Sequence, residues 1–145
     1  MTYGGAPLDK WEIKLSSSYS KQKFVVSMLK QVILGLQKLH TLGYTHGDLK
    51  PPNICARNRH DGSVKFTLID FGLSAKLASL DKKEKGQVFR GNLMFASTDH
   101  IISHRASALC DLYSLLCVSY FFLNKTLPWL DEVIVQNKKT GKNYY

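Results

Sequence analysis

Apolar side chains recur at helical spacing over the first long patterned segment of the chain, which begins near Lys21. They are separated by three or four residues, so that one face of a helix carries them. The positions are Phe24, Val25, Met28, Leu29, Val32, Ile33, Leu36 and Leu39. Ser20 is the expected N-cap, and Gly43 stands where a left-handed glycine ends a helix. The pattern therefore predicts an amphipathic helix from about Lys21 that stops before Gly43.

Two short β-like runs follow, "NICA" and "SVKFTLIDFG". The segment between them, "RNRHDG", contains Asp61-Gly62, a common turn dipeptide. Together they predict a small hairpin. Residues 1 to 10 and the polar, lysine-rich residues 74 to 90 are predicted to be loops.

The last patterned segment, from Ala108 to about Leu123, is apolar on nearly every face apart from Asp111. A helix that is apolar all round is a buried helix, so we predict one here. The terminal "NKKTGKNYY" is polar and is expected to be frayed.

The composition also indicates the net charge of the protein and the cellular compartment expected for it. The 145 residues are 44% hydrophobic, which suits one globular domain. The 20 basic and 11 acidic residues leave a net charge of +9, which favours anionic partners or is simply a solvated surface. The cysteines are three in number, and no apolar signal segment precedes them, so we expect reduced thiols in the cytoplasm or nucleus. The longest apolar run, residues 115 to 123, is shorter than the roughly 20 residues of a membrane span.

The stretch "HGDLKPPN" concentrates polar side chains directly after the first helix. Phosphoryl transfer needs a carboxylate to accept a hydroxyl proton, a cation beside the phosphoryl group, and oxygen ligands for magnesium. Asp48, Lys50 and Asn53 have these functional groups, and Asp70 of "DFG" supplies another carboxylate after the second β-like run. The order of the two motifs, with a hairpin between them, points to phosphoryl transfer more strongly than either motif alone.

These motifs resemble the protein kinase signature, H-x-D-L-K-x-x-N followed by D-F-G. Within the kinases, "HTLGYTHGDLKPPNIC", "FTLIDFGLSAK", "RGNLMFAS" and "DLYSL" with "LPW" are similar to the casein kinase 1 group, which includes the vaccinia-related and tau-tubulin kinases. That group lacks the usual A-P-E after the activation segment, and "FASTDH" stands in that place here. The similarity extends over residues 1 to 130. "MTYGGAPLDKW" resembles the hinge of the group.

The resemblance implies a role for each matching residue. Asp48 would be the catalytic base and Lys50 would contact the transferring phosphate, while Asn53 and Asp70 would bind Mg²⁺. The adenine of ATP would meet the backbone of the hinge and lie over two apolar side chains; the residues implied are Thr2, Tyr3, Gly4, Cys55 and Ile69. Four more would support the site: His46 beneath the D-F-G turn, Phe71 and Gly72 within it, and Asp111 as a buried acceptor for backbone N–H groups of the loop.

Each of these residues also has a simpler reading when it is taken alone. An isolated Asp-x-Lys is usually a surface pair, Asp70 could be only a turn residue, and Asp111 could offset the dipole of its helix. His100 and His104 are four residues apart and could share a metal, but no third ligand is evident. The cysteines are most simply small core residues. The order of all the motifs together favours the kinase interpretation.

The sequence departs from the family pattern within the loop and beyond it. Gly47 replaces an arginine that pairs with a phosphorylated activation loop, so we expect no switch of that kind. "ASALC" lacks the usual arginines before Asp111, which puts phosphate-primed substrate recognition in doubt. The lysines of residues 76 to 85 could still favour acidic protein substrates.

The expected fold is an α+β protein-kinase-like fold: a mainly helical C-lobe portion with a small β-hairpin, and no N-lobe. The 145 residues contain neither a G-x-G-x-x-G-x-V loop nor a V-A-I-K lysine. We interpret residues 1–130 as a partial kinase domain and residues 131–145 as a polar, flexible tail. Such a chain should expose apolar surface, and we expect it to need a protein partner, a larger complex or a longer polypeptide for stability.

Three functions are compatible with these observations. The first is a Ser/Thr protein kinase of casein kinase 1 type that uses ATP and Mg²⁺, with residues 1–145 alone insufficient for activity and weak in binding ATP. The second is a non-catalytic, kinase-like scaffold subunit. The third, a nucleic-acid-binding domain, is allowed by the charge but lacks a stacking or helix-turn-helix pattern.

Overall fold

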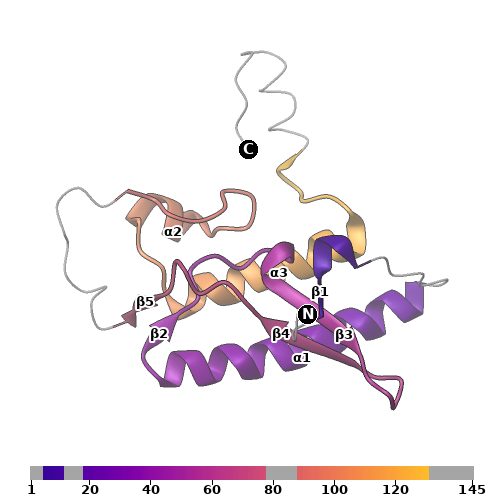
Figure 1. Cartoon of the computed structure of the whole chain (residues 1–145). Helices are drawn as coiled ribbons and strands as arrows, with labels where there is room; N and C mark the ends of the chain where they lie inside the picture. Colours follow the sequence, from indigo (N-terminus) through magenta and orange to yellow (C-terminus); the bar gives the residue numbers. More distant parts are fainter. Residues whose placement is uncertain (1–4, 12–17, 78–87, 131–145) are drawn as a thin grey trace.

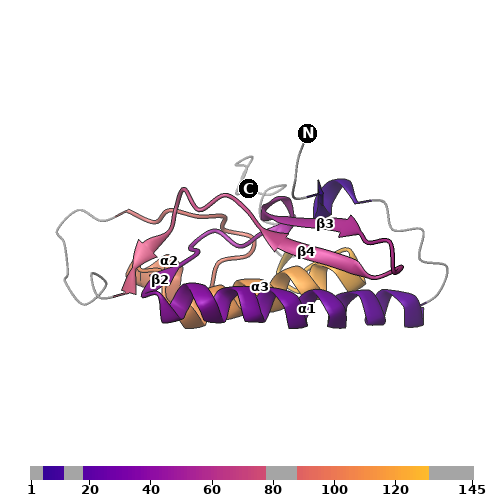
Figure 2. The ribbon, with the colours of Figure 1, turned by 60° about the horizontal axis from the view of Figure 1, so that its bottom comes forward.

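The computed structural model describes residues 5–11, 18–77 and 88–130. Helices α1 (Ser18–Thr41) and α3 (Ala108–Asn124) lie side by side, and strands β3 (Ile54–Asn58) and β4 (Val64–Leu68) form a hairpin layer above them (Figures 1 and 2). Aromatic rings join the layers. The Phe24 ring of α1 lies 4.9 Å from Phe66 of β4 and 5.2 Å from Phe122 of α3. The core therefore sits between the hairpin and the two helices.

The first helix is confirmed by the structure, with one correction. The buried positions on α1 include Phe24, Met28, Val32 and Leu36, at the predicted spacing. Ser20 is not the N-cap, because it lies inside the helix, which begins at Ser18. The predicted end is right: Gly43 has a φ of 82°, and its N–H donates to the carbonyl oxygen of His40 at 2.9 Å.

The predicted hairpin is also confirmed. Ile54 pairs with Leu68 and Asn58 with Val64 in an antiparallel ladder, and Gly62 in the turn has a φ of 77°. A side chain of α1 joins the hairpin to the helix layer. The Gln31 Nε2 atom donates to the Val64 carbonyl at 2.8 Å, and its Oε1 accepts from the Phe66 N–H at 3.1 Å.

The sequence suggested that residues 1 to 10 form a loop, but part of this segment has regular structure. Strand β1 (Ala6–Pro7) pairs with β3 at the edge of the sheet, and the 3-10 turn η1 (Leu8–Lys10) follows. Gly5 permits this pairing, because its φ is 97° and a Cβ there would lie 2.2 Å from the Ala56 carbonyl oxygen. The two-residue strand is too short to produce an alternating pattern in the sequence.

The prediction of a loop over residues 74 to 90 is wrong at its beginning. Strand β5 (Ala75–Lys76) pairs antiparallel with β2 (Tyr44–Thr45), so the chain after the D-F-G turn is joined to the chain before the polar loop. Residues 78–87, which contain most of the lysines of this segment, lie outside the described residues, as do residues 131–145.

Helix α3 is not buried all round, which corrects the second helix prediction. Its Val118 and Leu115 side chains are buried, but Leu109 is 76% exposed and Leu116 is 62% exposed. No element among the described residues packs on this face, so side chains that favour burial meet solvent. A further short helix, α2 (Thr98–Ser103), begins at the Ser97 N-cap and had no recognisable pattern in the sequence.

Two other sequence predictions concern the cysteines and membranes. Cys55, Cys110 and Cys117 are free and buried, as small core residues would be. Burial raises the pKa of the Cys55 and Cys117 thiols above the usual value, and the charge of Asp9 adds to the effect at Cys55. Within the described ranges, no helix combines the length and apolar character needed to cross a bilayer.

Candidate active site

The polar loop is held at both ends by backbone structure. It begins directly after β2. Lys50 is extended and precedes the 3-10 turn η2 (Pro51–Asn53), where the Asn53 N–H donates to the Lys50 carbonyl at 2.9 Å. Proline suits the first positions of such a turn, because its missing N–H would have no partner there. Strand β3 follows immediately. The polar side chains are thus presented from a segment fixed by β2 on one side and by β3 on the other.

Asp48 lies at the centre of this segment and is 8% exposed. Its Oδ2 atom accepts from the Lys50 ammonium at 2.6 Å and from the Asn53 Nδ2 at 3.2 Å. Asn53 Nδ2 also donates to the Asp48 backbone carbonyl at 2.8 Å. In the described part of the chain, Asp48 Oδ1 is the buried side-chain polar atom left without a partner. An unpartnered buried acceptor is costly unless a ligand supplies a donor.

Asp70 follows β4 and is brought to the same end of the hairpin as Asn53. The Ile69 N–H donates to the Asn53 carbonyl at 3.0 Å, so Asp70 comes directly after a residue tied to the loop. Asp70 has a φ of 61°, which is uncommon for a residue with a side chain, and its Oδ1 accepts from the Gly72 N–H at 3.3 Å. The side chain is exposed. The hairpin therefore delivers Asp48, Asn53 and Asp70 to one end of the sheet.

His46 connects the loop to the D-F-G turn. It is fully buried, its Nε2 lies 3.0 Å from the Ile69 carbonyl oxygen, and its Nδ1 accepts from the Asp48 N–H at 3.3 Å. Its ring centre lies 5.1 Å from that of Phe71, which is 49% exposed. If Nε2 donates to the carbonyl, the same imidazole can accept at Nδ1, so one tautomer satisfies both contacts.

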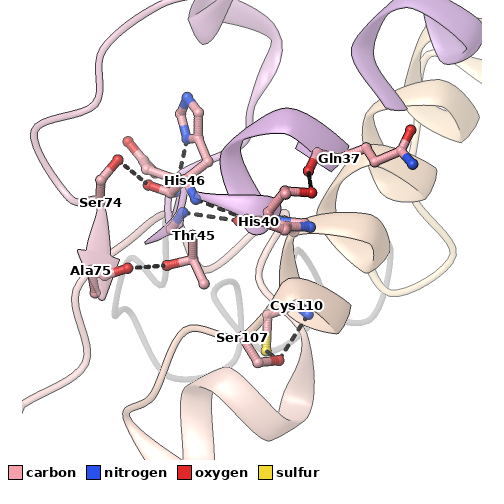
Figure 3. A network of polar contacts seen from close by, with 12 residues as sticks. Gln37, His40, Thr45, His46, Ser74, Ala75, Ser107 and Cys110 are labelled. Atoms are coloured by element: carbon pink, nitrogen blue, oxygen red, sulfur yellow. Dashed lines mark hydrogen bonds and ion pairs between the residues drawn. The ribbon is translucent and has the colours of Figure 1, made fainter. Parts of the chain in front are cut away.

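Asp111 reaches the loop from the first turn of α3. It is 2% exposed, and its carboxylate accepts from the backbone N–H groups of His46 at 2.8 Å and Gly47 at 2.9 Å. Figure 3 shows His46 within this polar network, beside Thr45 and Ser74. A carboxylate with several N–H donors is well suited to burial, because the bonds compensate its lost hydration.

Gly47 is placed where only glycine fits without strain. Its φ is 80°, and a Cβ atom would lie 2.6 Å from the Leu73 carbonyl oxygen. Leu73 directly follows the D-F-G turn. Gly47, which stands where the resemblance led us to expect an arginine, therefore lies at a point where two backbone segments approach closely.

The residues expected beneath the adenine are described only in part. Thr2, Tyr3 and Gly4 lie outside the described residues. Cys55 is buried in β3. Ile69 is half-buried just beyond the end of β4, where its N–H donates to the Asn53 carbonyl at 3.0 Å. Sequence reasoning missed His40, whose Nε2 lies 2.8 Å from Asp111 Oδ2. The position of His40 could have indicated this contact. It lies four residues after the buried Leu36, so a polar side chain occupies the next place on the buried face of α1.

His100 is buried in α2, and we expect the protein to be most stable when the imidazole of His100 is neutral. Its ring lies 5.0 Å from that of Phe89. Burial lowers its pKa below the usual 6.5, although the nearby Asp111, Asp99 and Asp48 oppose the shift. The unfolded state binds a proton at His100 more readily than the folded state. The contribution of neutral His100 to the free energy of unfolding should therefore be fully present above pH 6.5 and decrease as the pH falls below that value. Urea unfolding of wild type and His100→Asn across this range should show a flatter pH dependence for the variant.

His60→Asn is the matched control for this measurement, because His60 is exposed in the hairpin turn. It should leave the wild-type pH dependence in place. Equal pH slopes for wild type and His100→Asn would contradict the role assigned to His100.

The sequence also raised the possibility that His100 and His104 share a metal. In the described ranges, no group of at least three His, Cys, Asp or Glu side chains converges, so no third ligand for such a site is found there.

The fold and the site together define a class of protein. Helix α1 is followed by a loop with the buried Asp48, and the β3–β4 hairpin leads to the D-F-G turn. Asp111 of α3 accepts hydrogen bonds from the backbone of the loop. This is the arrangement of a protein kinase domain. The chain belongs to the protein kinase domain family, whose pattern matches residues 6–143.

Its relatives include several kinases. The casein kinase 1-like protein HD16 of Oryza sativa subsp. japonica is 34% identical over 129 residues, which are 82% of this chain and 18% of that protein. The serine/threonine-protein kinase Pkn1 of Myxococcus xanthus is 32% identical over 129 residues, 88% of this chain and 18% of the relative. Mitogen-activated protein kinase kinase kinase 8 of Rattus norvegicus is 31% identical over 127 residues, 88% of this chain and 25% of the relative. The chain thus spans about a fifth of the length of the first two relatives.

Proposed function

We propose that the chain carries the catalytic loop of a Ser/Thr protein kinase of casein kinase 1 type, within what corresponds to the C-lobe of the kinase domain. The observation that carries the proposal is the environment of Asp48. One carboxylate oxygen binds Lys50 and Asn53, while the other is unpartnered among the described residues. An oriented carboxylate with one unsatisfied acceptor is suited to receive a hydroxyl proton. The similarity to HD16 supports the casein kinase 1 assignment.

In the proposed reaction, the hydroxyl of a serine or threonine donates its hydrogen bond to Asp48 Oδ1. As the hydroxyl oxygen forms its bond to the γ-phosphorus of ATP, the O–H bond breaks and Asp48 takes the proton. The bond from that phosphorus to the oxygen bridging to ADP breaks at the same time or earlier. The Lys50 ammonium, 2.6 Å from Asp48 Oδ2, would offset charge on the phosphoryl oxygens when ATP is bound. Asn53 keeps the Asp48 carboxylate oriented through its Nδ2 bonds.

The donor set fits a magnesium ion. Asn53 uses Nδ2 for both of its bonds to Asp48, which leaves its Oδ1 as the oxygen that a cation could take. Asp70 adds an exposed carboxylate at the same end of the hairpin. Mg²⁺ prefers one or two protein oxygens combined with phosphate oxygens and water. When bound there with ATP, it would neutralise charge on the phosphates.

Substrates, partners and compartment are further parts of the proposal. The net charge of +9 favours acidic protein substrates. The exposed apolar face of α3, which includes Leu109, Leu116 and Tyr120, supports the need for a protein partner, a larger complex or further polypeptide. Buried free cysteines accord with a cytoplasmic or nuclear site. A non-catalytic scaffold is less well supported, because Asp48, Lys50 and Asn53 remain in mutual contact.

Transfer of labelled γ-phosphate from ATP to an acidic acceptor such as dephosphorylated casein tests this function. We expect the complete gene product to label serine or threonine in a reaction that needs Mg²⁺. Residues 1–145 alone should bind ATP only weakly, because their sequence contains no Gly-rich loop and no V-A-I-K lysine. Failure of the complete gene product to transfer phosphate would favour the scaffold. Micromolar ATP binding by residues 1–145 would contradict the expected weakness.

A further inference from the structure

We propose that the outer face of the β3–β4 hairpin, near its turn, is a docking surface for an acidic segment of another protein. The basic side chains of this face are Arg57, Arg59 and Lys65, called the hairpin cations below. None of them takes part in the reaction proposed above. The inference goes beyond that reaction, and a binding measurement tests it whether or not the protein transfers phosphate.

The strand ladder places the hairpin cations on one face of the sheet. Arg57 lies directly opposite Lys65, and the Arg59 N–H continues the ladder by donating to the Ser63 carbonyl at 2.8 Å. Arg57 and Arg59 are two residues apart, so their side chains leave the same side of the strand. Phe66, the residue after Lys65, is buried, whereas all three cations are exposed. The hairpin cations therefore lie on the face away from the core, and Figure 2 shows the long helices on the other side of the hairpin.

The pairing of Arg57 with Lys65 is unfavourable by itself, because like charges directly opposite each other in a ladder repel. Within the described residues, no Asp or Glu forms an ion pair with a hairpin cation. The charge of Asp61 in the turn acts on Arg59, but the Asp61 Oδ1 already accepts from the N–H and the hydroxyl of Ser63. An anion bound over the two strands would relieve the repulsion between Arg57 and Lys65.

The spacing of the hairpin cations suits an extended peptide. Opposite residues of an antiparallel ladder have Cα atoms about 4.5–5.5 Å apart, and alternate residues of one strand are about 7 Å apart. Carboxylates on alternate residues of an extended acidic segment also repeat about every 7 Å, so two of them can meet Arg57 and Arg59 together. Arginine adds direction to these contacts, because its guanidinium binds a carboxylate through two parallel N–H groups.

A surface hollow beside the turn gives such a segment a place to lie. Its volume is about 440 Å³, and its lining residues are Arg57, Asn58, Arg59, His60 and Asp61. The two arginines thus border a concave surface and do not simply project into solvent. A segment in this hollow would have donors from both arginines within reach.

The docking surface is separate from the candidate active site. Asn53 and Asp70 lie at the end of the hairpin where β3 begins and β4 ends, whereas the hairpin cations lie toward the turn. A strand of five residues, such as β3, spans about 17 Å. A segment docked near the turn would therefore leave Asp48 and its neighbours accessible.

Among anionic partners, a protein segment fits this face best. Proteins bind single-stranded nucleic acid by stacking its bases on aromatic side chains, and the described residues on this face include no Phe, Tyr or Trp. Recognition of an anionic membrane uses clusters of about four to eight basic residues. Three cations on a short hairpin are fewer than that, but they are enough for two or three carboxylates of a peptide.

Fluorescence anisotropy with the complete gene product tests the docking surface. The probe is a labelled peptide of about ten residues in which glutamate and serine alternate, in a buffer of low ionic strength to limit screening. Lys65→Glu removes one attraction and adds one repulsion, so we expect the peptide to bind about fivefold or more weakly. Lys65→Gln removes only the attraction and should weaken binding about two- to threefold.

Lys38→Glu is the matched control, because it makes the same change of charge at an exposed lysine in the last turn of α1. It should bind the peptide within about twofold of wild type. The urea midpoint supplies a second readout. A glutamate at position 65 would face Arg57 with the opposite charge, so the midpoint of Lys65→Glu should be higher than that of wild type. Weaker binding by this variant would then not result from poor folding.

Weaker peptide binding by Lys65→Glu, with a raised midpoint and normal binding by Lys38→Glu, supports the proposal. Equal affinities for wild type and Lys65→Glu, or equal losses in Lys65→Glu and Lys38→Glu, overturn it. A midpoint that is not raised contradicts the repulsion on which the inference rests. If Lys65→Glu does not fold, the peptide affinity of Lys65→Gln decides in the same way. Single-stranded DNA or vesicles rich in phosphatidylserine that bind more tightly than the peptide, and also depend on Lys65, would assign the face to a nucleic acid or a membrane and overturn the proposal.

Discussion

Asp48→Asn is expected to lower the rate of phosphoryl transfer by the complete gene product about 10²- to 10⁴-fold, the usual contribution of a general base. The asparagine has nearly the same shape, and its carbonyl oxygen can still accept from Lys50 and Asn53. What it loses is the ability to take a proton from the attacking hydroxyl. The change should therefore appear in kcat, with a small effect on KM for ATP, and the stability in urea should stay close to that of wild type.

Asp61→Asn is the matched control for this experiment, because it makes the same substitution at an exposed acid in the hairpin turn. It should leave phosphoryl transfer unchanged. An Asp48→Asn protein that keeps activity within about threefold of wild type would exclude Asp48 as the base. A loss of activity accompanied by unfolding in dilute urea would point instead to a structural role for the carboxylate.

Gly47→Ala should produce the second large effect, on stability. The positive φ alone costs a residue with a side chain about 1–2 kcal/mol. The new Cβ would also lie 2.6 Å from the Leu73 carbonyl oxygen, and this neighbour is backbone, which can move only with the chain after the D-F-G turn. We therefore expect the free energy of unfolding in urea to fall by about 2 kcal/mol or more.

Gly43→Ala separates the two causes. Gly43 has a nearly equal φ of 82°, but a Cβ there would have no atom within 4 Å. Its replacement should therefore cost only the conformational part, about 1 kcal/mol. Equal losses for Gly43→Ala and Gly47→Ala would show that the approach of Leu73 is accommodated at no cost.

Local patterns were sufficient for much of the fold. The stripe from Phe24 to Leu36 predicted α1, and Gly43 predicted its end, because helical periodicity and a left-handed glycine are properties of neighbouring residues. The hairpin was predictable for the same reason, from two β-like runs around Asp61-Gly62. The two-residue strands β1, β2 and β5 were not, since pairs of residues that short have no period of their own.

The burial of α3 could not be predicted from its composition. Leu109, Leu116 and Tyr120 have the apolar character of core residues, and periodicity alone implied that all faces were covered. Whether a face is covered depends on which other elements pack there. Among the described residues none does, and these side chains are exposed.

The sequence by itself determined the chemical groups of the site and their order: Asp48, Lys50 and Asn53 in one loop, and Asp70 after the hairpin. Only the tertiary structure decided how they are held. The His40–Asp111 contact joins residues 71 positions apart, and the close approach of the Leu73 carbonyl to Gly47 joins two separate loop segments. Spacing along a chain defines which residues share a loop or a helix face, but hydrogen bonds between distant segments depend on how the helices and the sheet pack together.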